Sequence, residues 1–310
     1  MSSIVAVGKF DGVHLGHRAL LREGRRWARA NGRAFLILTF PPQGDALLPL
    51  AVKLRLLRAF ADAVEVMRFE EVKGIPAPDF LRILRDEFGA RGLVMGPGHR
   101  FGRDRTGSPD YARSWGKRHG VEVRVVPPFL CQGRPVSARH IREHLRRGEV
   151  REAGLLLGRY PVVFGKRIAG AGLGKELGHP TVNLELRPEL LRPRSGVYLA
   201  WAFWDGGDAP GLFYLGARPT FPELPPTAEV HLFSPPRPEP EGEVEVQLLA
   251  FLRGDRRFPS AEALKAQISR DISRGRALLA SLPPPIGPLK GGPVDPGVES
   301  RSVVDGDGSG

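Results

Sequence analysis

The chain has 310 residues, of which 41% are hydrophobic and 26% charged, a composition typical of a folded globular protein with about two domains. No apolar run reaches the ~18–20 residues that cross a bilayer, and the single cysteine, Cys131, excludes an intrachain disulfide and a multi-cysteine metal site. The net charge of +12 suits anionic partners, either nucleotides or nucleic acid, without choosing between them. No secretory signal is visible, so we expect a cytoplasmic protein.

Short apolar segments alternate with segments of helical periodicity in the first part of the chain. Strands are predicted at 4–8, 34–40, 64–67, 93–95 and 121–126, and helices at 15–30, 52–60, 79–88 and 108–119. This alternation predicts a parallel α/β sheet of Rossmann-like type, in which ligands bind at the carboxyl ends of the strands. Helical periodicity continues over 137–157, so a first domain is placed at 1–157.

After Gly158 the chain becomes rich in glycine, proline and alternating β-type stretches. Strands are predicted at 162–168, 196–203, 212–216, 228–233 and 244–252, and a helix at 260–279 with Ser260 as its N-cap. This pattern predicts an antiparallel β-barrel followed by a C-terminal helix, a second domain at 158–282. Residues 283–310 are rich in proline and glycine and lack periodicity, so we expect a disordered tail.

Two histidines stand in a glycine-rich turn between the first strand and the first helix, in the segment GKFDGVHLGH at 8–17. Gly12 and Gly16 let a ligand approach the backbone closely, and His14 and His17 share one face of the first helical turn. A helix start favours a phosphate, and two imidazoles can stabilise charge on a transferring phosphoryl group. The structural alternative is a glycine-rich turn with a surface histidine pair.

This segment resembles the HxGH nucleotidyltransferases and, in its fuller form, the adenylyltransferase module of bacterial FAD synthetases. TFPP at 39–42, GPGHRFGRDRTG at 96–107, VSARHIREHL at 136–145 and GEVREAGLLLGR at 148–159 resemble further motifs of that module, in the same order. The resemblance implies transfer of AMP from ATP to FMN, with His14, His17 and Arg142 as catalytic residues. It implies ATP or phosphate contacts from Gly8, Phe10, Asp11, Gly12, Gly16, Arg100, Ser137 and Arg139.

Four positions depart from the pattern of this module. Gln43 stands in place of the histidine of PHP, Gly98 in place of an Asp or Asn, and Ala138 and Arg139 in place of a serine and a threonine. Each change removes a donor to phosphate or adenine, so the alternative is a kinase whose first domain is a degraded nucleotide- or flavin-binding regulatory module. As a hypothesis, Arg139 replaces the missing threonine as a phosphate ligand.

A second glycine-rich segment, GKRIAGAGLGKELGHPTVN at 165–183, lies at the start of the predicted barrel. Gly170, Gly172 and Gly174 favour a flexible backbone flap over phosphates. Thr181 and Asn183 are oxygen donors at i and i+2 of an extended segment, so both face one side and suit a Mg²⁺ ion. The alternative is a glycine-rich β-turn followed by a strand.

This stretch resembles the glycine-rich loop and PTxN motif of riboflavin kinases, and GVY at 196–198, LGARPTF at 215–221, TAEVHL at 227–232 and the segment 253–268 continue the resemblance. It implies that Glu229 is the general base for the ribityl hydroxyl that attacks ATP. It further implies Mg²⁺ at Thr181 and Asn183, phosphate contacts at Gly170, Gly172, Gly174 and Lys175, and flavin contacts at Arg218, Arg253 and Phe258. His231 is expected to be structural.

The two resemblances together cover residues 1–282 in the order of the bifunctional riboflavin kinase/FMN adenylyltransferase family. They imply riboflavin, FMN and ATP as substrates, Mg²⁺ with ATP as the cofactor, and FMN and FAD as products. Neither a nucleic-acid nor a membrane partner is expected, and self-association is left open. A basic nucleic-acid-binding protein, suggested by the net charge alone, is the weaker alternative.

Overall fold

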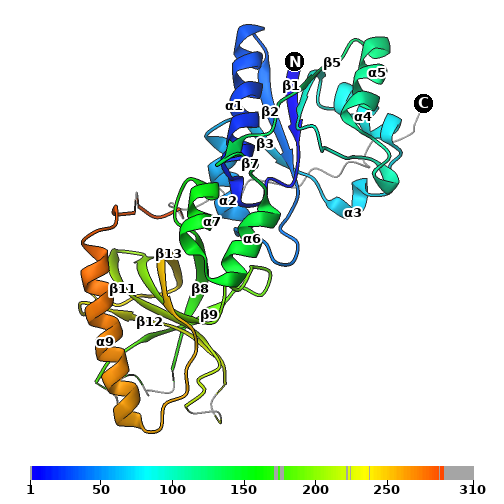
Figure 1. The fold of residues 1–310 in the computed structure, drawn as a ribbon. Coiled ribbons are helices and arrows are strands. Elements are labelled where there is room, and N and C mark those ends of the chain that lie inside the picture. Colours follow the sequence, from blue (N-terminus) through cyan, green and yellow to red (C-terminus); the bar gives the residue numbers. More distant parts are fainter. Residues whose placement is uncertain are drawn as a thin grey trace. The chain divides into compact units, whose positions relative to one another are not determined.

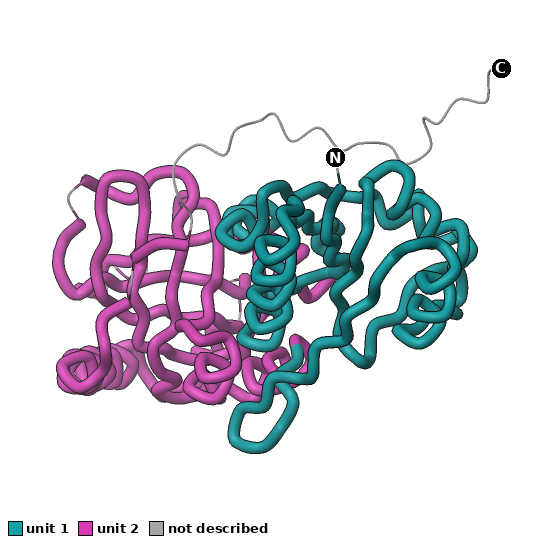
Figure 2. Tube along the Cα trace, turned by 90° about the horizontal axis from the view of Figure 1, so that it is seen from above, with its two compact units in different colours: residues 1–43, 50–137, 291–310 teal, residues 44–49, 138–290 magenta. Residues whose placement is uncertain are grey.

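The computed structural model describes residues 2–170, 174, 178–220, 223, 225–236, 238–285 and 287–289. These residues form two compact units, shown in different colours in Figure 2. The first unit contains residues up to 43 together with 50–137, and the second contains 44–49 together with the described residues from 138 onward. Gly172 and Lys175, two of the predicted phosphate contacts, lie outside the described residues.

The first unit is built on a five-stranded sheet in which every neighbouring pair is parallel, which confirms the predicted α/β class. Its strands in spatial order are β3 (Ala63–Val66), β2 (Ala34–Thr39), β1 (Ser3–Val7), β4 (Ala90–Met95) and β5 (Glu122–Val125). A short hairpin of β6 (Leu130–Cys131) and β7 (Arg134–Pro135) follows. Since β1 is the central strand, the turn that follows it lies in the middle of the carboxyl edge of the sheet.

Helices connect these strands (Figure 1). They are α1 (Leu15–Ala30), α2 (Leu50–Arg58), α3 (Phe69–Val72), α4 (Ala77–Asp86) and α5 (Pro109–His119), with the 3₁₀ turns η1 (Asp11–Val13) and η2 (Arg103–Arg105). Apolar faces of α4 and α5, including Phe80, Leu84 and Trp115, pack with Val5 and Leu93 of the sheet in one buried cluster. Removing these side chains from water drives the docking of the helices on the sheet.

Residues 138–157 form two helices that belong to the second unit, α6 (Ala138–Arg147) and α7 (Val150–Leu157). Gly148, whose φ is +79°, makes the turn between them. Ile141 and Leu157 share a buried cluster with Leu47 and Leu191, so these helices pack within the second unit. The compact units therefore divide the chain at 137/138, whereas the sequence pattern placed the domain boundary after 157.

The second unit is a closed six-stranded barrel with antiparallel neighbours, which confirms the predicted barrel and its C-terminal helix. Its strands in spatial order are β10 (Gly196–Trp204), β11 (Gly207–Gly216), β12 (Thr227–Leu232), β9 (Val182–Leu186), β8 (Val162–Ile168) and β13 (Glu243–Arg253). Alternate residues such as Tyr198, Phe213 and Val246 fill the interior. The helix α9 (Ala261–Leu279) runs along the outside, and Ser260 is its N-cap as predicted, accepting from the amide of Ala263 at 3.2 Å.

The described start of the expected tail lies against this barrel. The hydroxyl of Tyr160 donates to the carbonyl of Pro283 at 2.7 Å, and the amide of Leu289 donates to the buried carboxylate of Glu245 at 2.9 Å. Residues 290–310 lie outside the described residues. The extension beyond α9 therefore begins as a segment that is hydrogen-bonded to the second unit.

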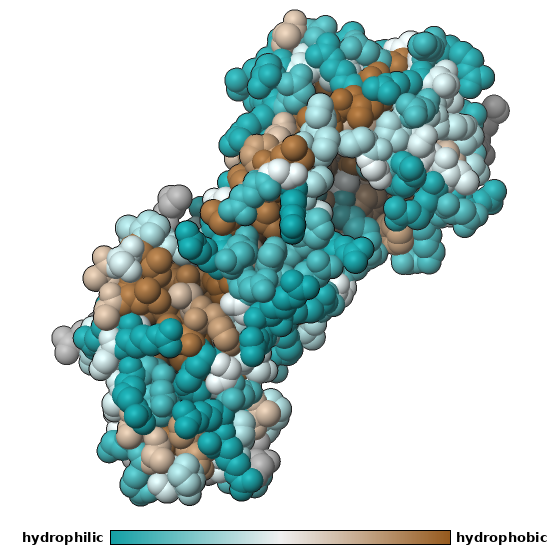
Figure 3. Space-filling model, viewed as in Figure 1, coloured by the Kyte–Doolittle hydropathy of each residue, from teal (hydrophilic) through white to brown (hydrophobic). Residues whose placement is uncertain are grey.

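The surface is mostly hydrophilic, with smaller apolar areas on both units (Figure 3). Phe129 and Leu130 beside the β6–β7 hairpin are among the exposed large apolar side chains. Within the described part of the chain, the helices lack the combination of length and apolar character that a membrane crossing requires.

Candidate functional sites

The turn after β1 has an unusual backbone. Phe10, Gly12 and Val13 all have positive φ, at +45°, +75° and +41°. A β-branched residue such as Val13 rarely adopts this conformation, because its side chain crowds the backbone. Backbone strain of this kind persists where the surrounding structure enforces it, typically at ligand sites. The predicted glycine-rich turn is therefore a tightly held loop at the carboxyl edge of the sheet.

The two histidines of this turn stack on each other, with ring centroids 3.6 Å apart and planes inclined by 16°. His14 is the N-cap of α1, since its Nδ1 accepts a hydrogen bond from the amide of His17 at 3.2 Å. A ring nitrogen that accepts carries no proton, so the proton of neutral His14 lies on Nε2. Burial, followed by the charges of His14 and Lys53, lowers the pKa of His17 well below its usual value. His17 is thus a neutral imidazole stacked against His14.

The segment 96–107 closes into a loop next to β4. The amides of Phe101 and Gly107 each donate to the other's carbonyl, at 3.2 and 2.9 Å. His99 packs on the Phe101 ring with a centroid distance of 5.9 Å, and burial, followed by Arg100 and Arg105, lowers the pKa of His99 to about 4. Arg100 itself is exposed and donates to the carbonyl of His99 at 2.9 Å. Its guanidinium remains at the surface, as a phosphate contact would require.

Two of the four positions that depart from the pattern of the module, Gln43 and Arg139, have partners of their own. Gln43 accepts a hydrogen bond from the ammonium of Lys9 at 2.7 Å, and Lys9 also lies over the ring of Phe69. Arg139 is exposed on α6 and pairs with Glu143 at 2.9 Å. Arg142 donates to the carbonyl of Asp45 at 2.8 Å. Arg139 and Arg142 belong to the second unit, whereas Ser137 ends the first.

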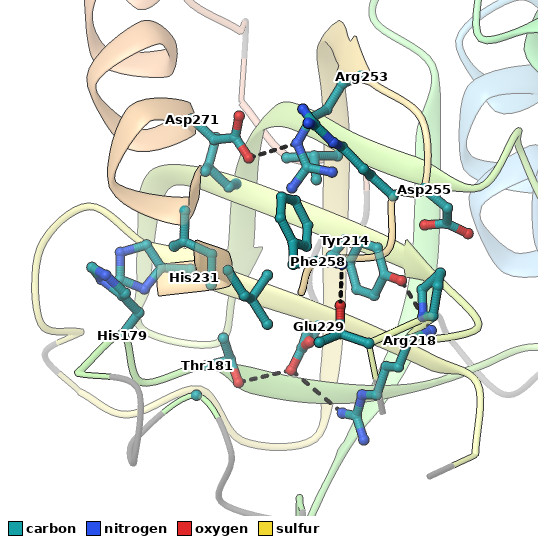
Figure 4. Close-up of a pocket in the computed structure, with 18 residues that line it drawn as sticks. His179, Thr181, Tyr214, Arg218, Glu229, His231, Arg253, Asp255, Phe258 and Asp271 are labelled. Atoms are coloured by element: carbon teal, nitrogen blue, oxygen red, sulfur yellow. Dashed lines mark hydrogen bonds and ion pairs between the residues drawn. The ribbon is translucent and has the colours of Figure 1, made fainter. Parts of the chain in front are cut away.

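A cavity between α9 and the outer face of the barrel brings together most of the residues expected in the second site (Figure 4). Thr181, beside the start of β9, donates a 2.9 Å hydrogen bond to Glu229 of β12. Arg218 lies on the other side of the carboxylate, with a nitrogen 3.6 Å from the same oxygen, Oε2. Asn183 is the cross-strand partner of Glu229 in the β9–β12 register. The predicted base and the two predicted metal ligands therefore share one small area.

The glycines of the second segment are required by close packing at these same residues. A Cβ on Gly170 would overlap the side chain of Asn183. A Cβ on Gly174 would lie 2.6 Å from the carbonyl of His179 and 2.9 Å from the hydroxyl of Thr181. The amide of His179 donates to the carbonyl of Gly174 at 2.7 Å. The backbone can thus approach Thr181 and Asn183 as a phosphate-covering segment must.

The wall of the cavity away from Glu229 is aromatic and apolar. Phe258 is buried between the guanidinium groups of Arg253 and Arg256, at 5.6 and 5.5 Å from its ring centroid. Leu264 and Ile268 of α9 and Val197 of β10 complete this part of the lining. Arg253 also pairs with the buried carboxylate of Asp271 at 2.8 Å, which joins the end of β13 to α9. This wall suits a flat, largely apolar ring system.

Tyr214, Asp255, Asp271 and His179 line the cavity and escaped the sequence analysis. The hydroxyl of Tyr214 accepts the amide of Arg218 at 3.1 Å, and burial raises the pKa of Tyr214 to about 12. Arg218 has a φ of +51°, so this hydrogen bond helps to hold a strained backbone beside Glu229. These four residues come from separate segments of the chain, so their shared position is visible only in the folded barrel with α9 packed on it.

Thr181 and Asn183 fit a divalent cation that arrives with nucleotide phosphates. Their oxygens are hard donors, and the backbone of Gly170 and Gly174 packs directly against these two side chains. In the described part of the chain, no cluster of three or more His, Cys, Asp or Glu side chains could hold a metal ion on its own. Two neutral oxygen donors leave most of the coordination of such an ion to phosphate oxygens and water.

Two family models match the chain, one for each predicted activity. The model described as FAD synthetase matches residues 1–140, and the model described as riboflavin kinase matches residues 157–279. Two proteins described as bifunctional riboflavin kinase/FMN adenylyltransferase align over both regions. The protein from Pseudomonas fluorescens is 32% identical over 290 residues, which covers 89% of this chain and 93% of the relative. The protein from Escherichia coli K12 is 30% identical over 282 residues, 86% of this chain and 90% of the relative.

A solved structure has the same fold over most of the chain. It is described as a macrolide-efflux protein from Streptococcus pneumoniae and has a TM-score of 0.79 at 26% identity, covering 89% of this chain and 94% of that protein. Since relatives named for both activities align across both matched regions, the comparisons support the two-activity interpretation and not the kinase with a degraded first domain.

Proposed function

Because the chain belongs to the bifunctional riboflavin kinase/FMN adenylyltransferase family, we propose that its two sites act on riboflavin, FMN and ATP. The barrel site converts riboflavin and ATP to FMN and ADP. The site at the edge of the parallel sheet converts FMN and a second ATP to FAD and pyrophosphate. The observation that carries the proposal is that Thr181 and Arg218 both contact the carboxylate of Glu229 beside an aromatic cavity.

Glu229 acts as the general base of the kinase step. Thr181 and Arg218 both engage its Oε2, which fixes the direction of the carboxylate. The ribityl 5′-hydroxyl gives its proton to Glu229 while its oxygen attacks the γ-phosphorus, and ADP leaves with the electron pair of the broken bond. Phe258 and the apolar wall hold the flavin ring, and Arg253 supports this wall through Asp271.

The Mg²⁺ ion that accompanies ATP is assigned to the oxygens of Thr181 and Asn183. When bound, such an ion neutralises the charge of the transferred phosphoryl group. Gly170 and Gly174 pack directly against these two side chains, so the backbone there can come close to phosphates that they hold. We also assign phosphate contacts to Gly172 and Lys175, which the sequence motif contains.

Adenylyl transfer needs orientation and charge stabilisation more than a base. The phosphate of FMN attacks the α-phosphorus of ATP, and pyrophosphate leaves with the electrons of the broken bond. The Nε2–H of His14 donates to the phosphate oxygens as charge develops on them, and His17 adds a second imidazole. The start of α1 and the backbone at Gly8, Gly12 and Gly16 complete the phosphate site. Arg100, in the loop next to β4, adds a further phosphate contact.

The remaining assignments follow from these reactions. We assign adenylyl transfer to residues 1–157 and the kinase to residues 158–282. The partners are small molecules, namely riboflavin, FMN and ATP, and the enzyme is placed in the cytoplasm, where it would draw on the ATP pool.

The test is one incubation of the full chain with riboflavin, excess ATP and Mg²⁺, with the flavins separated over time. We expect FMN first and FAD afterwards. H14N, which keeps an N-cap acceptor, should accumulate FMN, while E229Q should make FAD only when FMN is supplied. FMN without FAD from the unaltered chain would remove the second activity, and no flavin product would overturn the whole proposal.

A further inference from the structure

Lys53 is a buried lysine beside the adenylyl-transfer turn. It lies on α2 and only 3% of its surface is exposed. A lysine ammonium is seldom buried unless it is paired, because removing it from water is costly. Here it donates to the carbonyl of Lys9 at 3.2 Å and makes a shorter contact with the carbonyl of Phe40.

The two acceptor carbonyls lie just beyond the ends of neighbouring parallel strands. Lys9 follows β1 and Phe40 follows β2, and the hydroxyl of Thr39 adds a third link by donating to the carbonyl of Lys9 at 3.2 Å. Lys53 therefore ties together two strand ends at the edge where this fold binds ligands. The hydrogen bond from Lys53 holds the carbonyl of Lys9, the residue immediately before the strained segment that begins at Phe10.

The charges around Lys53 belong to the same turn. Burial lowers the pKa of Lys53 to about 8, opposed by the carboxylate of Asp11 and aided by the charge of Lys9. Lys53 is also one of the groups that lower the pKa of His17, after burial and His14. A residue that only filled the core would not need a charge at this place.

We propose that Lys53 is a positioning residue for adenylyl transfer, whose charged ammonium fixes the turn from Lys9 to Val13 and so sets the direction of His14. This inference rests on the proposed adenylyltransferase function. Lys53 acts through the backbone of Lys9 and Phe40, and it is not assigned a contact with substrate. Loss of the ammonium would release the strained turn, and a displacement of about 1 Å at reacting groups can cost about 100-fold in rate.

The competing explanation is that Lys53 only stabilises the first unit. In that case the folded fraction of a K53M protein would retain its rate per molecule, and K53R would have the same pH profile as the unaltered chain. Under our proposal, adenylyl transfer falls as pH rises through about 8, because the neutral amine of Lys53 donates weaker hydrogen bonds to the two carbonyls and loses its attraction to Asp11. His17 does not titrate in this range, because its pKa is lowered.

The experiment uses the full chain and measures both reactions in each variant. We expect K53M to lose about 100-fold in the rate of FAD formation from FMN, while riboflavin phosphorylation stays within about twofold. K53R should recover part of the rate and keep it above pH 8. K117M, which removes an exposed lysine of α5, is the matched control and should behave like the unaltered chain.

The outcomes separate this proposal from the proposed function. FAD formation by K53M at the unaltered rate would overturn the role of Lys53 while leaving the adenylyltransferase in place. If K53M does not fold, the K53R pH profile decides, and a profile identical to that of the unaltered chain overturns the proposal. An unaltered chain that makes no FAD at any pH would instead refute the adenylyltransferase function and, with it, this role.

Discussion

Thr181 and Glu229, 48 residues apart in the chain, are joined by a 2.9 Å hydrogen bond in which the hydroxyl donates to Oε2 of the carboxylate. Arg218 approaches the same oxygen at 3.6 Å. Among the described residues both partners engage Oε2, so Oε1 is the oxygen with which the proposed base would accept the proton of a substrate hydroxyl. The pairing of β9 with β12 in the barrel makes this arrangement.

Removing the hydroxyl of Thr181 should therefore weaken the kinase alone. A hydrogen bond to a charged group is worth about 1.5–3 kcal/mol, so we expect T181A to lower riboflavin phosphorylation by about 10- to 100-fold. T181S keeps the hydroxyl and should retain most of the rate. Initial rates of FMN formation measure the effect, with E185Q on the exposed face of β9 as the control. Equal rates for T181A and T181S would show that the hydroxyl has no role.

A methyl group at Gly170 should disturb the same site from the opposite side. A Cβ there would overlap the amide of Asn183, so G170A must displace either the segment or the side chain. We expect a loss of at least about tenfold in riboflavin phosphorylation, with FAD formation from supplied FMN unchanged. G44A is the matched control, since a Cβ on Gly44 meets open space. A G170A protein with full kinase activity would contradict the assignment of Asn183.

The sequence predicted the sheet and barrel classes because their periodicities differ clearly over many residues. It missed β9, since Val182–Leu186 begins within the PTxN motif at 180–183 and its alternation is only five residues long. It also treated 137–157 as one helical region, although Gly148 turns the chain within it. Boundaries of this kind depend on tertiary packing, here of Ile141 with Leu47 and Leu191, which no local pattern contains.

The candidate sites show the same division between local and tertiary information. Thr181 and Asn183 could be named because their i, i+2 spacing is local, and Glu229 because TAEVHL at 227–232 resembles a motif of riboflavin kinases. Lys53 and Asp271 could not, since each is an ordinary charged residue on a helix until its burial and its partners are known. A charged residue at an apolar position of a predicted amphipathic helix is the one sequence signal that both share.

Asp271 should hold α9 against the end of β13. Its side chain is 5% exposed and pairs with Arg253 at 2.8 Å, while Gln267 donates to its other oxygen at 2.9 Å. D271A would leave the Arg253 charge without this partner, and we expect about 2 kcal/mol less local stability, or roughly 30-fold faster amide exchange in α9. Hydrogen exchange of the full chain measures this. D79N, at an exposed ion pair of α4, is the control, and unchanged exchange in D271A would refute the anchor.

His99 should make the first unit less stable in acid. Its pKa is lowered to about 4 in the folded chain, mainly by burial, against 6.5 for an unperturbed histidine. Between these values the unfolded chain binds a proton that the folded chain does not, so stability falls as pH decreases from about 6.5 towards about 4. The H99F protein should lose less stability between pH 7 and pH 5 than the unaltered chain. Part of the pH dependence of stability should remain, because His17 is also buried and its pKa is also lowered. Thermal unfolding of both proteins across this range measures the difference, and parallel curves would show that His99 does not titrate on unfolding.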